Sequence, residues 1–139
     1  MTPQELLETL DDEKQTIEFV VNAILNGEYT TLPDTIANGK VLKILYNGDL
    51  KSEEGYEQGF LVLTPNSSIK KHKHINDVEM YTLLYGILSV DGNICDKNIC
   101  LIDEEHCIDE VTTITIIKTL KVSKRLLQQK INVLRIPIK

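Results

Sequence analysis

The spacing of apolar residues changes once along this chain, from a helical period to the period of β-strands. Between residues 17 and 25 apolar side chains recur at intervals of three and four, which predicts an amphipathic helix ended by Asn26 and Gly27. Its apolar positions are Ile17, Val20, Val21, Ile24 and Leu25. Thr2-Pro3-Gln4-Glu5 has the pattern of a capping box and predicts a shorter helix before it. Residues 1–30 are therefore expected to form a helical segment that packs on the rest of the chain or on a partner subunit.

From residue 31 onward, short apolar or alternating runs are separated by turn-forming pairs such as Asn47-Gly48 and Asp91-Gly92. The predicted strands are residues 41–46, 59–64, 69–74, 79–89, 94–102, 111–122 and 131–138, the last as an edge strand with Pro137 near its end. The acidic stretch 51–58 is interpreted as a solvated loop. This number of short strands predicts a sandwich or a small barrel, and the length predicts one domain over residues 31–139.

Two histidines and a glutamate lie in and beside one of these predicted strands. His72 and His74 are two residues apart, so on a strand both imidazoles point to one face. Glu79 reaches the same side only if the chain turns at Asn76-Asp77, and both residue types favour turns. Imidazole nitrogens and a carboxylate oxygen suit Fe, Mn, Ni, Co, Cu or Zn, so one divalent transition metal is the expected cofactor. The alternative is a chance gathering of histidines on the surface.

A fourth residue completes a longer pattern. His72, His74, Glu79 and Gly86 have the spacing His-x-His-x4-Glu-x6-Gly, which resembles the first motif of the cupin superfamily. The second motif of that family carries one histidine on a later strand, and His106 falls where that strand would begin. The resemblance implies that His72, His74, Glu79 and His106 together hold the metal.

Around His106 the sequence departs from the family pattern. Leu101 and Asp103 stand where cupins usually have Pro and Gly, and Glu110 stands where they have Asn. The resemblance covers roughly residues 40–122. It implies an all-β fold, the double-stranded β-helix or cupin jelly roll, here preceded by a short N-terminal α-helical segment.

Strand parity adds four candidates for the pocket around the metal. Tyr81 and Leu83 share the face of the glutamate and are expected to line the interior. Lys70 shares the face of the two histidines and would attract an anionic substrate, unless it is a rim lysine with only its stem on the surface. Lys118 lies on the even-numbered face of strand 111–122, which would place it near the metal. A bulge beside Ile117 would instead turn Lys118 outward.

Composition narrows the class of partner. The chain has 139 residues, 21 of them acidic and 15 basic, for a net charge of −6, which disfavours nucleic acid and anionic membrane surfaces. The N-terminus is acidic, and no apolar run approaches the roughly 18 residues that a bilayer requires, so a cytoplasmic protein is expected. The odd number of cysteines, Cys95, Cys100 and Cys107, predicts reduced thiols.

Two functions remain open at this point. The first is a metal-dependent enzyme acting on a small polar molecule as a dioxygenase, isomerase, epimerase or lyase. The second is a non-catalytic module whose pocket senses or sequesters a small molecule while the helices mediate assembly. Small cupins commonly pair, so the resemblance also implies a homodimer, with the helix at residues 17–25 or the edge at 131–138 as the contact.

Overall fold

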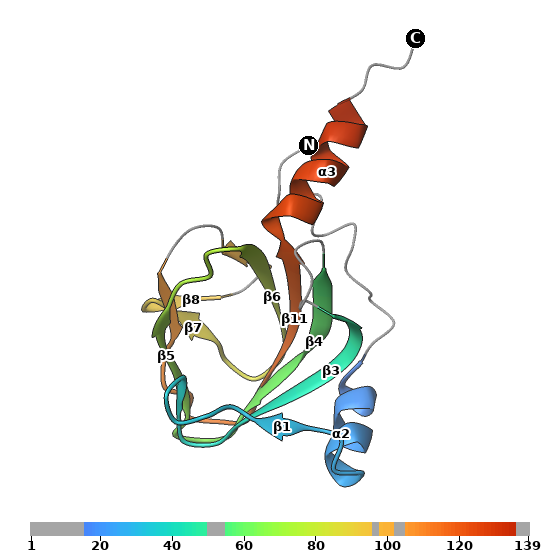
Figure 1. The fold of residues 1–139 in the computed structure, drawn as a ribbon. Coiled ribbons are helices and arrows are strands. Elements are labelled where there is room, and N and C mark those ends of the chain that lie inside the picture. Colours follow the sequence, from blue (N-terminus) through green and yellow to red (C-terminus); the bar gives the residue numbers. More distant parts are fainter. Residues whose placement is uncertain (1–15, 50–54, 96–97, 102–104, 136–139) are drawn as a thin grey trace.

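The computed structural model describes residues 16–49, 55–95, 98–101 and 105–135, which form two antiparallel sheets rolled against each other (Figure 1). The larger sheet has the order β1 (Thr30–Thr31), β3 (Val41–Asp49), β4 (Tyr56–Leu63), β11 (Thr115–Ser123), β6 (Asp77–Tyr85) and β9 (Ile99–Leu101). The smaller has the order β2 (Ala37–Asn38), β5 (Ser68–His72), β10 (His106–Ile108), β7 (Ser89–Val90) and β8 (Asn93–Ile94). The predicted all-β architecture after a helical N-terminal segment is confirmed.

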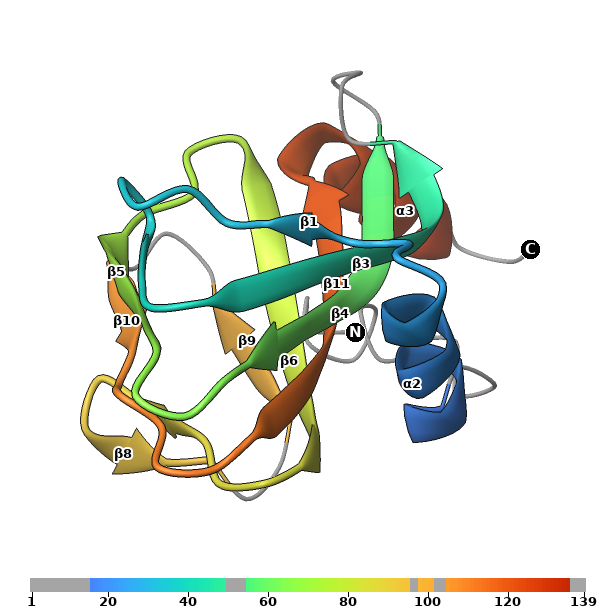
Figure 2. The same ribbon diagram turned by 90° about the horizontal axis from the view of Figure 1, so that it is seen from below.

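The first described helix, α2, spans Ile17–Leu25 and has the predicted bounds. Gly27, with φ of 71°, follows it in the left-handed conformation that commonly ends helices. Val20 and Ala23 bury its inner face against the outer side of the larger sheet (Figure 2), together with side chains of β3 and β4. The helix predicted from Thr2 lies outside the described residues.

The second described helix, α3, replaces a predicted strand. Residues 131–135, expected to begin an edge strand, belong to α3 (Lys124–Arg135), and residues 136–138 lie outside the described part. Ser123 caps the helix, because its Oγ accepts a hydrogen bond from the backbone N–H of Leu126 at 3.1 Å. Leu127 is buried against Val78 and Val122 of the sheet. The alternation after Ile131 also fits a helix, and the cap at Ser123 decides between the two.

Three strand boundaries also differ from the expected ones. Residues 56–58, interpreted as part of a solvated loop, are the first residues of β4. The run 94–102 is not one strand, because its two ends form β8 and β9 in different sheets. The run 79–89 is divided at Gly86 into β6 and β7. In the last two cases a turn or a change of sheet interrupts an apolar run that looks continuous in the sequence.

Gly86 stands where the chain leaves β6, and we expect Gly86→Ala to cost about 3 kcal/mol of unfolding free energy. Its φ is +89°, and a Cβ there would lie 2.5 Å from the Ile114 carbonyl oxygen and 2.7 Å from Thr115 Oγ1. Gly92 has a φ of +80° but no atom within 4 Å of such a Cβ, so Gly92→Ala should cost about 1 kcal/mol. Urea unfolding of both variants measures the difference. Equal losses would contradict the steric argument.

Apolar side chains fill the space between the two sheets. Leu63, Ile108 and Ile117 are among its core residues and are 1% exposed or less. Polar side chains also turn inward, and a cavity opens beside them. Neither described helix is long and apolar enough to cross a bilayer.

Candidate metal centre

Three side chains from one short segment and a fourth from a later strand meet on the inner surface of the roll. His72 ends β5, His74 follows it, Glu79 lies on β6 and His106 begins β10. One nitrogen or oxygen atom from each lies within 4.8 Å of the corresponding atoms of the others. Glu79 and His106 are each 1% exposed. The structure thus brings together all four residues that the sequence singled out as candidate ligands.

An extra residue in β5 aims His72 at this point. His106 lies opposite His72 and Ile108 lies opposite Ile69, so two residues of β5, Lys70 and Lys71, face the single Cys107 of β10. Such a bulge shifts the alternation of the strand by one position. Ile69 and His72 consequently both point inward, although they are three residues apart.

Hydrogen bonds fix how two of the imidazoles are presented. His72 Nδ1 lies 2.7 Å from the backbone carbonyl oxygen of Lys70, which can only accept, so Nδ1 is the donor of this hydrogen bond and Nε2 is the ring nitrogen left to face a metal. His74 Nδ1 lies 3.3 Å from Asp77 Oδ2 in the same way. Outer partners of this kind orient the histidine ligands of metal sites.

The donor set fits a divalent transition metal. Burial lowers the pKa of His74, an effect that Lys121 and His72 add to and the carboxylates of Glu79 and Asp77 oppose, so its ring is neutral near pH 7. His74 Nε2 and Glu79 Oε1 are buried and have no hydrogen-bond partner among the described residues. Unsatisfied buried polar atoms are costly and rare in proteins, and a metal ion would satisfy both.

A row of alternating charges leads across the larger sheet to Glu79. Lys121 on β11 pairs in register with Glu57 on β4 and with Glu79 on β6. Lys121 Nζ lies 3.3 Å from Glu79 Oε2, and Lys43 Nζ lies 3.6 Å from Glu57 Oε2. Burial opposes the charge of Lys121, but the neighbouring carboxylates, Glu79 above all, raise the pKa of Lys121 above its usual value. Lys121 therefore stays protonated beside the candidate centre.

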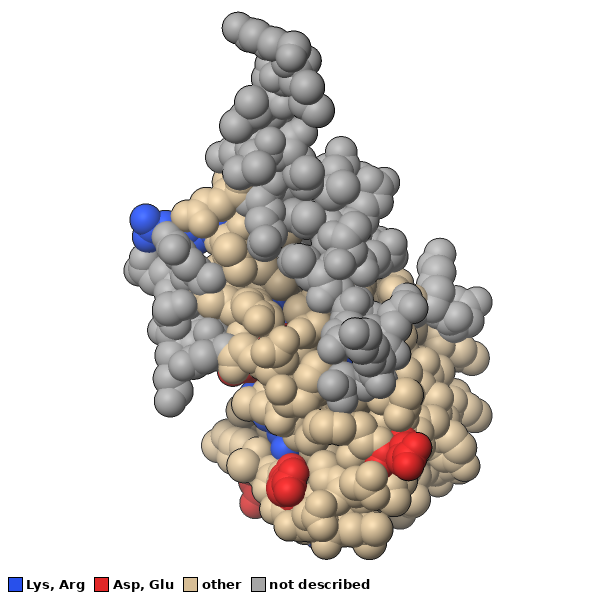
Figure 3. All heavy atoms as spheres, turned by 90° about the vertical axis from the view of Figure 1, so that its right-hand side faces the viewer, with Lys and Arg blue, Asp and Glu red and all other residues tan. Residues whose placement is uncertain are grey.

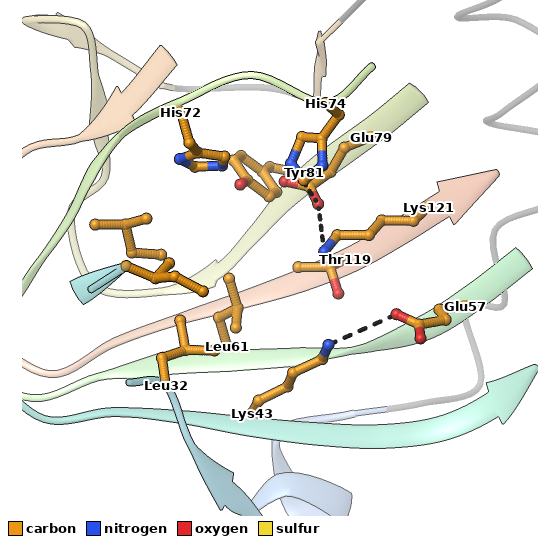
Figure 4. Close-up of a pocket in the computed structure, with 12 residues that line it drawn as sticks. Leu32, Lys43, Glu57, Leu61, His72, His74, Glu79, Tyr81, Thr119 and Lys121 are labelled. Atoms are coloured by element: carbon orange, nitrogen blue, oxygen red, sulfur yellow. Dashed lines mark ion pairs between the residues drawn. The ribbon is translucent and has the colours of Figure 1, made fainter. Parts of the chain in front are cut away.

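These residues line a cavity of about 200 Å³ (Figure 4). Its charged wall carries the two ion pairs, and its other wall is apolar. The lining residues are Leu32, Ile36, Lys43, Glu57, Leu61, Ile69, His72, His74, Glu79, Tyr81, Thr119 and Lys121. In this view His72, His74 and Glu79 lie above the two lysines, and the ion pair between Glu79 and Lys121 joins the two groups.

Solved structures with the same two-sheet roll are known. One is an acetylacetone dioxygenase from Acinetobacter johnsonii (TM-score 0.57, 12% identity, 75% of this chain and 85% of that chain). Another is a cupin-like protein from Thermotoga maritima (TM-score 0.55, 12% identity, 70% and 79%). A third is a predicted oxalate decarboxylase from Thermotoga maritima (TM-score 0.53, 17% identity, 68% and 91%). The chain has the cupin fold. No model of a protein family and no curated protein matches its sequence.

Among the four pocket candidates, Tyr81 lines the cavity. Leu83 packs in the same core but does not reach the cavity. Lys70 points out of the roll, because the bulge in β5 reverses its face, and its Nζ donates a hydrogen bond to the Asp34 carbonyl oxygen at 2.7 Å. Lys70 is therefore a rim lysine rather than a cavity residue.

Lys118 is buried, with 4% exposed, but on the outer side of the larger sheet. It lies opposite Phe60, which packs toward α2, whereas the neighbouring Ile117 and Thr119 face inward. The odd-numbered residues of β11 thus form its inner face, the reverse of the parity that the sequence suggested. The expectation that Lys118 lies near the metal is not met.

Sequence reasoning missed Lys43, Glu57, Thr119 and Lys121 as cavity residues. Lys43 and Lys121 each interrupt an apolar strand. A charged residue within an apolar strand was the signal in the sequence that could have identified them as cavity residues. Glu57 was hidden by its place in an acidic run that resembles a loop. Which lysine faces inward depends on the register between strands, which the sequence does not state.

The unfolding free energy of Tyr81→Phe protein should fall less steeply with rising pH above about 10 than that of the wild type. Burial first, and then the charge and a hydrogen bond of Glu79, raise the pKa of Tyr81 well above its usual value. The folded state therefore holds this proton more tightly than the unfolded chain does, and the stability is complete below about pH 10 and falls above it. Tyr81 should account for a loss of about 1.4 kcal/mol of unfolding free energy for each pH unit above 10. Urea unfolding at pH 8 to 11 measures it.

Tyr85→Phe provides the matched control, because Tyr85 lies on the same strand and is 57% exposed. Its stability should decline with pH as in the wild type. If Tyr81→Phe declined just as steeply, the buried phenol would not be the titrating group.

Proposed function

We propose that this cupin binds one divalent transition metal through His72, His74, Glu79 and His106 and acts with it on a small polar molecule, as a dioxygenase, isomerase or lyase. The observation that carries the proposal is the meeting of four donor atoms within 4.8 Å, three of them from residues that line a cavity: His72, His74 and Glu79. Three imidazoles and one carboxylate are ligands that Fe, Mn, Ni, Co, Cu and Zn accept.

The bound ion would supply Lewis acidity, polarising a carbonyl or holding an enediolate in place. His72, His74, Glu79 and His106 would hold the ion, and a substrate in the cavity could bind to it. Tyr81 remains a neutral phenol at pH 7, because its pKa is raised, and can donate a hydrogen bond near Glu79. Leu32, Leu61 and Ile69 form an apolar wall that excludes water from the reacting groups.

The similar solved structures support a small oxygen-bearing substrate. Two of them are named for acetylacetone and oxalate, both small molecules with two oxygen-bearing carbons that can face a metal ion. Because the identities are 12% and 17%, these names indicate a class of ligand and not a particular substrate for this chain.

The test is turnover by protein loaded with Fe(II) or Mn(II). A panel of small oxo acids, diketones and sugar acids would be incubated with it, with and without oxygen, and followed by proton NMR. We expect at least one compound to be converted by the loaded wild type and not by His106→Ala protein exposed to the same metal. Binding of panel members without any conversion would contradict an enzymatic role.

One observation favours the second function, a non-catalytic binding module. The carboxylates among the described lining residues are Glu57 and Glu79, and each is paired with a lysine. No unengaged carboxylate therefore stands ready as a general base on the described walls. A sensing or sequestering cupin would need only the metal, the lysines and the apolar wall.

We also propose that this cupin is a cytoplasmic homodimer, with residues 31–139 as its one domain. Ile17, Val21 and Leu25 form an exposed apolar row on α2, with 37%, 46% and 78% of their surfaces accessible. On the side of the molecule that carries α2, the described charged side chains are few and scattered (Figure 3). Light scattering should give a dimer for the wild type and a monomer for Val21→Lys. A wild-type monomer at micromolar concentration would contradict the proposal.

A further inference from the structure

We infer that the cavity takes a small monoanion, a carboxylate with a short aliphatic chain, whose charged end faces the metal centre and the two lysines. This inference rests on the proposed metal site and goes beyond it by naming the charge and shape of the ligand. Three features of the cavity carry it: the sum of its charges, the sharing of Glu57 between two lysines, and the separation of charged and apolar walls.

The first feature is the charge of the loaded cavity. Lys43, Lys121 and a divalent ion bring four positive charges, and three carboxylates oppose them with three negative charges. The carboxylates are Glu57, Glu79 and, behind His74, Asp77. The histidines add none, since metal ligation requires neutral rings. One positive charge remains, and uncompensated charge in a partly buried site is unfavourable. A ligand with a single negative charge balances the site.

The second feature is that Glu57 serves two lysines. Its Oε2 lies 3.6 Å from Lys43 Nζ, and Glu57 also lies directly opposite Lys121 where β4 pairs with β11. Lys121 in turn lies between Glu57 and Glu79 on the neighbouring strands, with its Nζ 3.3 Å from Glu79 Oε2. Once a metal ion takes up the charge of Glu79, two lysines face one carboxylate. The surplus ammonium charge then lies on the cavity wall, where Lys43 and Lys121 lie below His72 and His74 in Figure 4.

The third feature is the apolar wall. Leu32, Ile36, Leu61 and Ile69 face the cavity beside the charged groups, so the part of the ligand away from its carboxylate is aliphatic. The cavity has a volume of about 200 Å³. It is somewhat larger than a cavity that holds benzene, so it has room for a ligand of about eight non-hydrogen atoms. A short-chain oxo acid has this size, this charge and an oxygen atom to offer the metal.

The test uses full-length protein loaded with Zn(II), which binds such sites without redox chemistry, and isothermal titration calorimetry with two probes. The anionic probe is α-ketovalerate, and the neutral probe is 2,3-pentanedione, which has the same chain length and two adjacent oxygen-bearing carbons. We expect α-ketovalerate to bind at least about tenfold more tightly. The comparison isolates the negative charge, because the two probes have similar size and shape.

Two variants move the charge of the cavity in opposite directions. Lys43→Met removes one positive charge and should weaken α-ketovalerate binding about tenfold, whereas Glu57→Gln removes one negative charge and should tighten it by several fold. Neither should alter the affinity for 2,3-pentanedione or the zinc content. Lys71→Met is the matched control, because the Lys71 side chain is 65% exposed and ion-paired with Glu105 on the outer surface. It should leave both probes unaffected.

The outcomes distinguish a failure of this inference from a failure of the proposed metal site. Protein that takes up no zinc overturns the metal site and the inference with it. Protein that holds one zinc per chain but binds the two probes equally, or responds alike to Lys43→Met and Glu57→Gln, overturns the inference and leaves the metal site standing.

Discussion

His74→Ala protein is expected to lose its metal, with affinity falling by more than about a hundredfold, while its fold stays intact. Removal of even an outer partner of a ligand costs ten- to a hundredfold, and a ligand itself costs more. The chain has three histidines, and the other two already lie in the site, so none can substitute. His74 follows the end of β5 and its side chain is 20% exposed, so its loss should not disturb strand pairing. Competition with a chromophoric chelator measures the affinity.

Lys73→Ala is the control for this variant, because Lys73 is the exposed neighbour of His74 and points away from the site. It should bind metal as the wild type does. Full metal content in His74→Ala protein would mean that the ion is held elsewhere or by the remaining three residues alone.

The second large effect is expected for Lys121→Met in chelator-treated protein, with a loss of about 3 kcal/mol in unfolding free energy. The Glu79 carboxylate is 2% exposed, and Lys121, at 3.3 Å, is a direct cationic partner for it. Removing that partner leaves a buried negative charge with less compensation. A bound divalent ion would provide the missing compensation, so with stoichiometric Zn(II) the same substitution should cost less than about 1 kcal/mol. Urea unfolding in the two conditions gives the comparison.

Lys43→Met is the matched control, since the ion pair between Lys43 and Glu57 is more exposed, with 28% and 19% of the side chains accessible. It should cost no more than about 1 kcal/mol in either condition. If zinc failed to rescue Lys121→Met, Glu79 would not be in contact with the ion.

The local part of the site could be predicted from the sequence, and the long-range part could not. His72, His74 and Glu79 lie within eight consecutive residues, and the turn between them follows from Asn76 and Asp77. His106 carried no such local signal and was identified by the resemblance to cupins. The ladder from Glu57 through Lys121 to Glu79 depends on pairing between strands far apart in the sequence.

Two errors of facing have different physical causes. In a strand, one added residue moves every later side chain to the other face. The bulge in β5 turned Lys70 outward while keeping His72 inside, and the true parity of β11 placed Lys118 outside and Lys121 inside. The apolar and polar pattern of β11 did not reveal this, because both of its faces are buried, one by the core and one by the helices.

The C-terminal helix shows a different limit. A short run such as Ile131-Asn132-Val133 fits either a strand or a helix, because its period is too brief to distinguish them. The local signal that decides is Ser123, followed by residues with high helix propensity through Lys130.

The measurement that tests the central claim most directly is anomalous diffraction from crystals of the full chain grown with Zn(II). The account predicts one strong peak per chain inside the roll, about 2.0 to 2.2 Å from a nitrogen of His72, His74 and His106 and from an oxygen of Glu79. A peak bound to other residues, or well-ordered side chains at these four positions with no ion between them, would contradict it.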